Sequence, residues 1–198
     1  MTAETPTPLS LPIATRRLIL REYTKDDVPA VLAYVDDENY WQHHSVERPK
    51  PEQLSALILW AVQEQAIKPR LNHYLAVARK DTQQIIGEAV LRLTNPEMKQ
   101  AEIGFGVAPK HWRQGYATEI GQALLEAAFA RMKMHRVAAQ CAPENKPSIR
   151  VMQKLGMARE ALLRDIVQAR GRWWSSAVYS VLETEYAKIK GVQITNPR

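Results

Sequence analysis

Residues 111–118, which read HWRQGYAT, have residue types suited to holding an anion. Small and β-prone residues over 101–107 predict a strand just before them, and apolar residues at helical spacing predict a helix over 116–132. The first N–H groups of a helix lack intrahelical partners and lie at the positive end of its dipole. Gly115 lets a phosphate approach the main chain closely, and Arg113 adds positive charge. We therefore predict a loop that binds pyrophosphate.

The same local pattern has a plainer explanation, because a glycine between a strand and a helix often serves only to make a turn. The nearby Gly104-Phe105-Gly106 is not a dinucleotide-binding fingerprint, since Pro109 stands where the third glycine is required. Both interpretations of the loop stay open at this point, and a second motif is needed to decide between them.

The composition predicts an ordinary globular protein of one domain, with 198 residues of which 45% are hydrophobic and 24% charged. A single cysteine, Cys141, excludes an internal disulfide framework and suits a reducing compartment. The first residues have no apolar region typical of a signal peptide, and no apolar run is long enough to span a membrane. We expect a cytoplasmic protein that has no membrane partner.

The excess positive charge lies in the half of the chain that contains the loop. Residues 1–99 hold 12 Lys/Arg and 13 Asp/Glu, whereas residues 100–198 hold 15 and 8, a net charge of +7. A nucleic acid or a small polyphosphate ligand explains this asymmetry equally well. The basic half has no run of consecutive basic residues, so we favour the small ligand and expect no nucleic-acid partner.

The remaining pattern alternates strands and helices and predicts an α/β sandwich around a mixed sheet. Strands are predicted over 16–23, 74–78, 85–93, 101–107, 136–142, 157–168 and 173–182. Helices are predicted from the N-cap Thr24 to Val35 and over 52–66, 116–132 and 145–155, the last ended by Gly156. We expect a flexible N-terminal arm over 1–15, a single domain over 16–186 and a C-terminal tail over 187–198.

A second motif, residues 145–157 (NKPSIRVMQKLGM), resembles the Asn-x-x-Ser…Lys-Leu-Gly-Phe/Met segment of the GCN5-related N-acetyltransferases (GNATs). Together with WRQGYATE, it resembles the RimJ/RimL-type branch that acetylates the N-termini of ribosomal proteins. The resemblance covers about residues 15–185. It implies an acyl-CoA acyltransferase fold with a mixed, mostly antiparallel sheet of about seven strands flanked by helices. It also implies an acetyl-CoA-dependent N-acetyltransferase whose acceptor is a protein N-terminal α-amine.

The resemblance also assigns the residues that contact acetyl-CoA. It implies that the pyrophosphate binds the loop amides, that the pantetheine pairs with strand 101–107 where this strand diverges from 136–142, and that Asn145 contacts the pantetheine. The implied acetyl-CoA-binding residues are Phe105, Val107, Arg113, Gln114, Gly115, Tyr116, Ala117, Thr118 and Asn145. Many relatives have Gln or Arg where this chain has Trp112, which affects a side-chain contact but leaves the amides in place.

Direct acetyl transfer needs a neutral amine, a polarised thioester carbonyl and a proton for the leaving thiolate. An α-amine, with a pKa of about 8, needs only a modest base. Glu102 is the candidate base because the family often places a carboxylate on this strand, the alternative being a solvent-facing residue. The N–H near Val107 is the candidate that polarises the carbonyl. Many relatives carry a tyrosine where this chain has Met152, so Ser148 is the candidate partner of the thiolate or, alternatively, a helix-capping residue.

Several alternatives concern the acceptor. Aromatic and histidine residues in the loop 36–51 are expected to shape its site, and four nearby acids could suit a small cationic amine instead: Asp36, Asp37, Glu38 and Glu47. Ser175-Ser176 replaces an aspartate common in relatives, and a non-catalytic acyl-CoA-binding module is a further alternative. We expect no metal, since the histidines lack ligand spacing. The paired final strands make a homodimer plausible, and Cys141 is expected to be structural.

Overall fold

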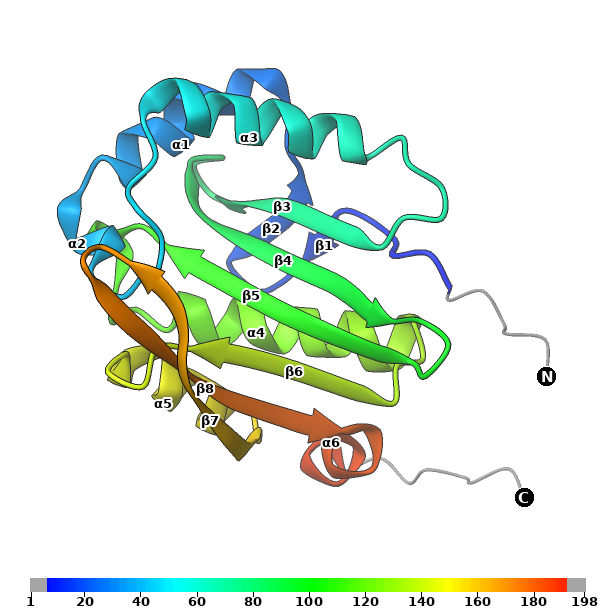
Figure 1. Cartoon of the computed structure of the whole chain (residues 1–198). Helices are drawn as coiled ribbons and strands as arrows, with labels where there is room; N and C mark the ends of the chain where they lie inside the picture. The colour runs from blue at the N-terminus through cyan, green and yellow to red at the C-terminus, as the bar shows by residue number, and fades with distance from the viewer. Residues whose placement is uncertain (1–6, 192–198) are drawn as a thin grey trace.

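The computed structural model describes residues 7–191 and contains one eight-stranded sheet of order β1-β2-β3-β4-β5-β6-β8-β7 (Figure 1). Adjacent strands are antiparallel except for the pair β5–β6, which is parallel. The strands are β1 (Ile13–Ala14), β2 (Leu18–Glu22), β3 (Asn72–Arg79), β4 (Ile85–Asn95), β5 (Gln100–Val107), β6 (Arg136–Cys141), β7 (Ala158–Ala169) and β8 (Arg172–Leu182).

Helices cover both faces of this sheet. They are α1 (Val28–Val35), α2 (Glu38–Trp41), α3 (Pro51–Glu64), α4 (Tyr116–Glu126), α5 (Lys146–Lys154) and α6 (Glu183–Lys190). Short 3-10 turns form at Lys25–Asp27 and Pro109–His111, and α4 continues into a π-helical turn at Ala127–Arg131. None of the described helices is long and apolar enough to cross a membrane.

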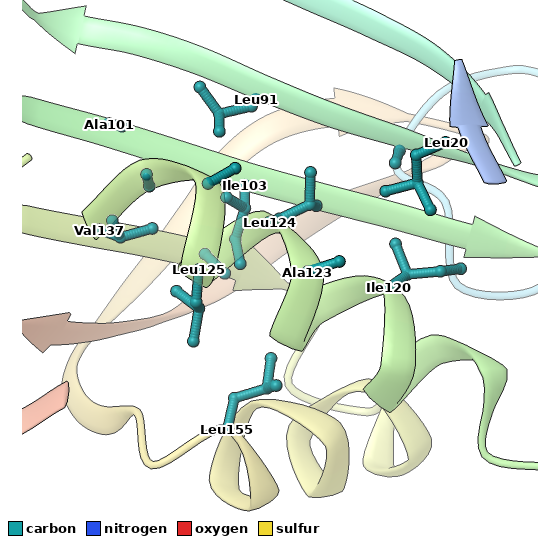
Figure 2. Packing of buried hydrophobic residues seen from close by; sticks show 14 of the residues in the cluster. Leu20, Leu91, Ala101, Ile103, Ile120, Ala123, Leu124, Leu125, Val137 and Leu155 are labelled. Atoms are coloured by element: carbon teal, nitrogen blue, oxygen red, sulfur yellow. The ribbon is translucent and has the colours of Figure 1, made fainter. Parts of the chain in front are cut away.

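Two apolar cores form because successive side chains of a strand point to opposite faces. On β5, Ala101 and Ile103 belong to the larger core, which packs against α4 and α5, whereas α1–α3 cover the smaller core on the opposite face. Figure 2 shows Leu124 of α4 beside Ile103, with Leu155, the C-cap residue of α5, on the side of α4 away from the sheet. The apolar stripe of α4 therefore packs the helix firmly against the strand that precedes the loop.

The predicted α/β fold is confirmed, and every predicted strand and helix is present with ends shifted by a few residues. The structure adds β1, whose two residues lie in the expected arm and pair with β2, and it adds α2 within the predicted loop 36–51. It also adds α6, which carries the fold beyond residue 186 into the expected tail up to Lys190. The rest of the arm (1–6) and of the tail (192–198) lies outside the described residues.

Candidate active site

The two parallel strands of the sheet form a fork. β5 and β6 pair only at Gln100↔Arg136, Ala101↔Val137 and Glu102↔Ala138, although both strands continue further. Beyond these pairs β4 holds β5 as far as Val107, and β8 holds β6 as far as Cys141. The strands consequently diverge toward their carboxyl ends, as the resemblance implies (Figure 1).

Backbone groups of β5 point into the fork. The amide of Ala108 donates to Ile86 of β4 at 2.8 Å, and hydrogen-bonded positions alternate along an antiparallel pair. The groups of Gly106 therefore face β4, and those of Phe105 and Val107 face the fork. The indole of Trp112 donates to the Val107 carbonyl at 2.6 Å, so Val107 presents its amide there. The backbone of Phe105 and the amide of Val107 thus face the fork, and their contact with pantetheine stays a prediction.

The loop before α4 has backbone strain that exposes its amides. Arg113 has φ 61° and Gly115, the N-cap of α4, has φ 81°, both in the left-handed region. The amides of residues 113–118 donate to no other described residue. Free amides at a helix N-terminus, beside residues in left-handed conformation, are the geometry of an anion site. These amides are thus available to an anion, and pyrophosphate binding at this loop stays a prediction.

Arg17, just before β2, contacts this loop, although nothing in the local sequence predicts it. Its guanidinium lies 4.2 Å from the ring centroid of Tyr116, donates to the Gln114 carbonyl at 2.9 Å and pairs with Glu119 at 2.7 Å. Burial raises the pKa of Glu119, but the hydrogen bonds from Thr15 and Arg17 outweigh it and lower that pKa. Arg17 lies 97 residues before Gln114, so a motif of closely spaced residues cannot predict this contact.

A groove of about 590 Å³ lies between α4 and residues 13–17, next to the loop. Its walls include Gly115 and Thr118 of the predicted loop. Positive side chains dominate the charged part of its lining, which consists of Arg16, Arg17, Arg131, Lys154 and Lys190 against Glu119 and Glu126. The groove therefore favours an anionic occupant.

Residues after β6 form the other side of the fork. The side-chain oxygen Oδ1 of Asn145 caps α5 by accepting from the Ser148 amide at 3.0 Å. The Ser148 hydroxyl lies beside Cys141, and burial raises the pKa of this thiol more than the hydrogen bond with Ser148 lowers it. Cys141 is therefore a thiol at neutral pH, in keeping with the structural role expected of it. Met152, in place of the family's tyrosine, is only 1% exposed and packs in the larger core.

Glu102, the predicted base, lies at the closed end of the fork, where β5 and β6 are still paired. Its carboxylate accepts from the Gln140 side chain at 3.2 Å, and Gln140 in turn accepts from Ser176 at 3.0 Å. Val107 is five positions after Glu102, which is about 17 Å along a strand. The fold therefore does not bring Glu102 next to the Val107 amide.

The open end of the fork is bordered by α2 and the β7–β8 turn. Arg170 joins them, since its guanidinium donates to the Trp41 carbonyl at 2.7 Å and its amide to Glu47 at 2.8 Å. Trp174 is buried and Trp173 is 55% exposed, which matches the predicted alternation. Among residues 7–191, no three His, Cys, Asp or Glu side chains are grouped so that they could hold a metal ion.

Known proteins are similar to this chain both in sequence and in architecture. Residues 17–158 match the sequence profile of the acetyltransferase (GNAT) domain. The uncharacterised N-acetyltransferase YnaD of Bacillus subtilis (strain 168) is 34% identical over 174 residues, covering 88% of this chain and 98% of YnaD. The crystal structure of a GNAT-family acetyltransferase from Bacillus anthracis has a TM-score of 0.76 at 30% identity, covering 88% and 99% of the two chains.

A candidate ribosomal-protein-serine acetyltransferase from Vibrio cholerae has a TM-score of 0.74 at 22% identity, covering 88% of this chain and 98% of its own. At that identity the likeness shows the fold alone. The forked sheet, the amide-lined loop and the profile match define the class of protein: the chain belongs to the GNAT family of acetyltransferases. It is an acetyl-transferring enzyme, and its acetyl donor is acetyl-CoA.

Proposed function

We propose that this enzyme transfers the acetyl group of acetyl-CoA to the α-amine of a protein N-terminus. The pyrophosphate binds the amides of residues 113–118, with Arg17 beside them, and the nucleotide end lies in the basic groove along α4. The pantetheine enters the fork along Phe105 and Val107. The observation that carries this binding mode is the divergence of β5 and β6 directly beside a loop of free amides.

Chemical roles in the fork follow from the groups that point into it. The Val107 amide donates to the thioester carbonyl and polarises it. The backbone carbonyl of Val107 is already bonded to the Trp112 indole, so the amide is the group that Val107 offers to the substrate. Asn145, whose side-chain oxygen caps α5, offers its amide hydrogens to the pantetheine. Ser148 and Glu102 stay predictions for the thiolate partner and the base.

Acidic residues around α2 favour a single α-amine over a small polycation. Asp36 pairs with Arg48, Asp37 accepts from the Asn39 amide at 2.9 Å, and Glu47 accepts from the Arg170 amide at 2.8 Å. Three of the four acids that could form an acidic groove are therefore already engaged. A polyamine or aminoglycoside, which carries several positive charges, would find few free carboxylates there. A single α-amine needs only one carboxylate.

The acceptor is tested by following thiol release from acetyl-CoA with four amines: a peptide with a free N-terminal serine, its N-blocked twin, spermidine and an aminoglycoside. We expect turnover with the free peptide and none with the blocked one. Turnover with spermidine or the aminoglycoside alone would identify the small-amine alternative. Binding of acetyl-CoA with no turnover on any amine would contradict the proposed acceptor. The cytoplasmic location and the absence of a nucleic-acid partner stay predictions.

A further inference from the structure

A carboxylate that the proposed mechanism does not use lies beside the fork. Glu88, on β4, is directly opposite Gly106 of β5 and opposite Ala76 of β3. These residues share the face of the sheet that α1–α3 cover, because Ala76 belongs to the core of that face. Neither neighbour has a bulky side chain, so the Glu88 carboxylate lies above small residues. A Cβ added to Gly106 would come within 3.1 Å of a Glu88 oxygen.

Three buried tyrosines lie near this carboxylate, and one of them contacts it. Tyr40 of α2 donates to Glu88 Oε1 at 2.8 Å. The hydroxyls of Tyr23 and Tyr34 are buried, and neither has a partner in hydrogen-bonding geometry among the described residues. None of the ion pairs formed within residues 7–191 includes Glu88. Glu88 is thus a partly buried carboxylate that has one hydrogen-bond donor and no cation.

A buried charge without a counter-charge is costly, so such a group calls for an explanation. Packing does not supply one, since a neutral residue of similar shape would fill the same space. A cationic ligand does, because a protonated primary amine brings the missing positive charge and three N–H donors.

Glu88 also lies where the reacting amine must arrive. It is opposite Gly106, and the next residue of β5, Val107, presents the amide that faces the fork. Adjacent strands are about 5 Å apart, so Glu88 lies one strand spacing from this position, whereas Glu102 is about 17 Å away. An amine that attacks a carbonyl held at Val107 from the α1–α3 face passes the Glu88 carboxylate.

We propose that Glu88, held by Tyr40, binds the ammonium group of the acceptor and, in place of the predicted Glu102, is the base that removes its proton. This step rests on the proposed function only in requiring acetyl transfer to a primary amine. It does not require that the amine is a protein N-terminus. The ammonium gives one proton to the carboxylate, and its nitrogen then forms the C–N bond to the acetyl carbon. The C–S bond breaks, and the leaving thiolate takes the second proton that the nitrogen loses. Glu88 returns its proton to solvent.

Electrostatics agree with this role. Burial raises the pKa of Glu88 above that of an ordinary glutamate, and the hydrogen bond from Tyr40 lowers it by less, which makes Glu88 a better base than an exposed carboxylate. The groups that face it stay neutral at assay pH, because burial and the charge of Glu88 raise the pKa values of Tyr23, Tyr34 and Tyr40. His44, stacked on Tyr40, has its pKa lowered by burial. Arg21, farther along the same row of the sheet, is paired with Asp27.

The test compares Glu88→Gln with wild type, using the amine that wild type acetylates fastest. Glutamine keeps an acceptor for the Tyr40 hydroxyl but cannot take a proton. We expect kcat/KM to fall by about 100-fold or more at pH 7, the usual contribution of a general base. The deficit should shrink toward pH 9.5, since an α-amine with a pKa of about 8 then deprotonates by itself. The Kd for acetyl-CoA should be unchanged.

Two further variants make the result specific. Glu97→Gln, in the exposed turn after β4, is the matched control and should keep wild-type kcat/KM. The loss of kcat/KM in Glu102→Gln should be smaller than the loss in Glu88→Gln. If Glu102→Gln shows the large, pH-dependent loss instead, or if Glu88→Gln stays within threefold of wild type, Glu88 is not the base. Should Glu88→Gln not fold, Tyr40→Phe replaces it, and a loss below threefold there would equally overturn the proposal.

These outcomes separate the inference from the proposed acceptor. If wild type acetylates only spermidine or an aminoglycoside, the N-terminal acceptor is wrong, yet the Glu88→Gln comparison proceeds on that amine. The same loss is then expected at pH 7, with little recovery at pH 9.5 for spermidine, because a primary alkyl amine with a pKa of about 10 stays largely protonated there. If wild type acetylates the free peptide and Glu88→Gln does so equally well, the acceptor stands and the role of Glu88 fails. If wild type acetylates no primary amine, both are wrong.

Discussion

His73 on β3 is a buried histidine that we expect to lower the stability of the fold at acid pH. It is 4% exposed, and its Nδ1 has no hydrogen-bond partner among the described residues. Burial, with a smaller contribution from the charge of Arg70, lowers its pKa from 6.5 to about 4. The folded state therefore binds this proton less readily than the unfolded state does. The contribution of neutral His73 to the free energy of unfolding is therefore fully present above pH 6.5. It is lost progressively as the pH drops toward 4.

At pH 5 this single group should reduce the free energy of unfolding by about 2 kcal/mol relative to pH 7.5. We expect His73→Leu to remove most of that difference in urea unfolding measured at the two pH values. His135→Gln, which changes an exposed histidine, is the control and should leave the difference in place. An equal pH dependence in wild type and His73→Leu would show that His73 is protonated in the folded protein.

At the scale of elements, the junction between β5 and α4 determines whether the loop can hold pyrophosphate. Gly115 has φ 81°, and a Cβ there would lie 3.5 Å from the nearest atom, the Arg17 Nη2, which is ordinary contact. A substitution at Gly115 is therefore costly because of its backbone conformation and not because of crowding. Straightening that conformation would turn the amides of residues 113–118 away from their common direction.

Gly115→Ala should lower the free energy of unfolding by about 1–2 kcal/mol, the cost of a left-handed conformation for a residue with a Cβ. It should also weaken acetyl-CoA binding, measured by calorimetry. Gly171→Ala is the matched control, since Gly171 has φ 71° in the β7–β8 turn with no atom within 4 Å of its added Cβ. The control should lose similar stability and keep its affinity for acetyl-CoA. Equal affinities in the two variants would contradict the role of the loop.

For the whole molecule, the exposed edge of the sheet bears on the predicted homodimer. β7 is one of the two edge strands, and apolar side chains of the β7–β8 hairpin are exposed: Leu162, Leu163, Ile166, Val167 and Trp173. A long edge strand with exposed apolar side chains can pair with a second copy. The dimer stays a prediction from the sequence, and this hairpin is the surface on which we expect it.

Light scattering at about 50 μM should give twice the chain mass of 22.5 kDa. A charge at the centre of the hairpin, Trp173→Arg, should return the protein to a monomer because an interface buries charge unfavourably. Met98→Arg, at an exposed methionine in the turn after β4, is the control and should not change the mass. A wild-type monomer at this concentration would rule out the expected homodimer.

Local patterns were sufficient to predict most of the elements. The apolar stripe of α4, the turn at Gly115 and the cap at Asn145 each depend on residues within a few positions of one another, and all three are present. The two-residue strand β1 was missed because so short a segment has no periodicity. The helix α6 was missed because no helix was predicted after the last strand and residues 187–198 were assigned to a C-terminal tail.

Side-chain partners from distant elements depend on the tertiary structure. Arg17 reaches the loop across 97 residues, and Tyr40 reaches Glu88 across 48. In the sequence, Glu88 and Glu102 are alike, each a glutamate in an alternating strand. Strand register decides between them, because it sets Glu88 opposite Gly106 near the open end of the fork and Glu102 opposite Ala138 at the closed end. The sequence by itself thus determined the elements and the family, through local periodicity and motifs. Only the packing of the sheet decided which carboxylate lies beside the site, since register depends on contacts between strands far apart in the chain.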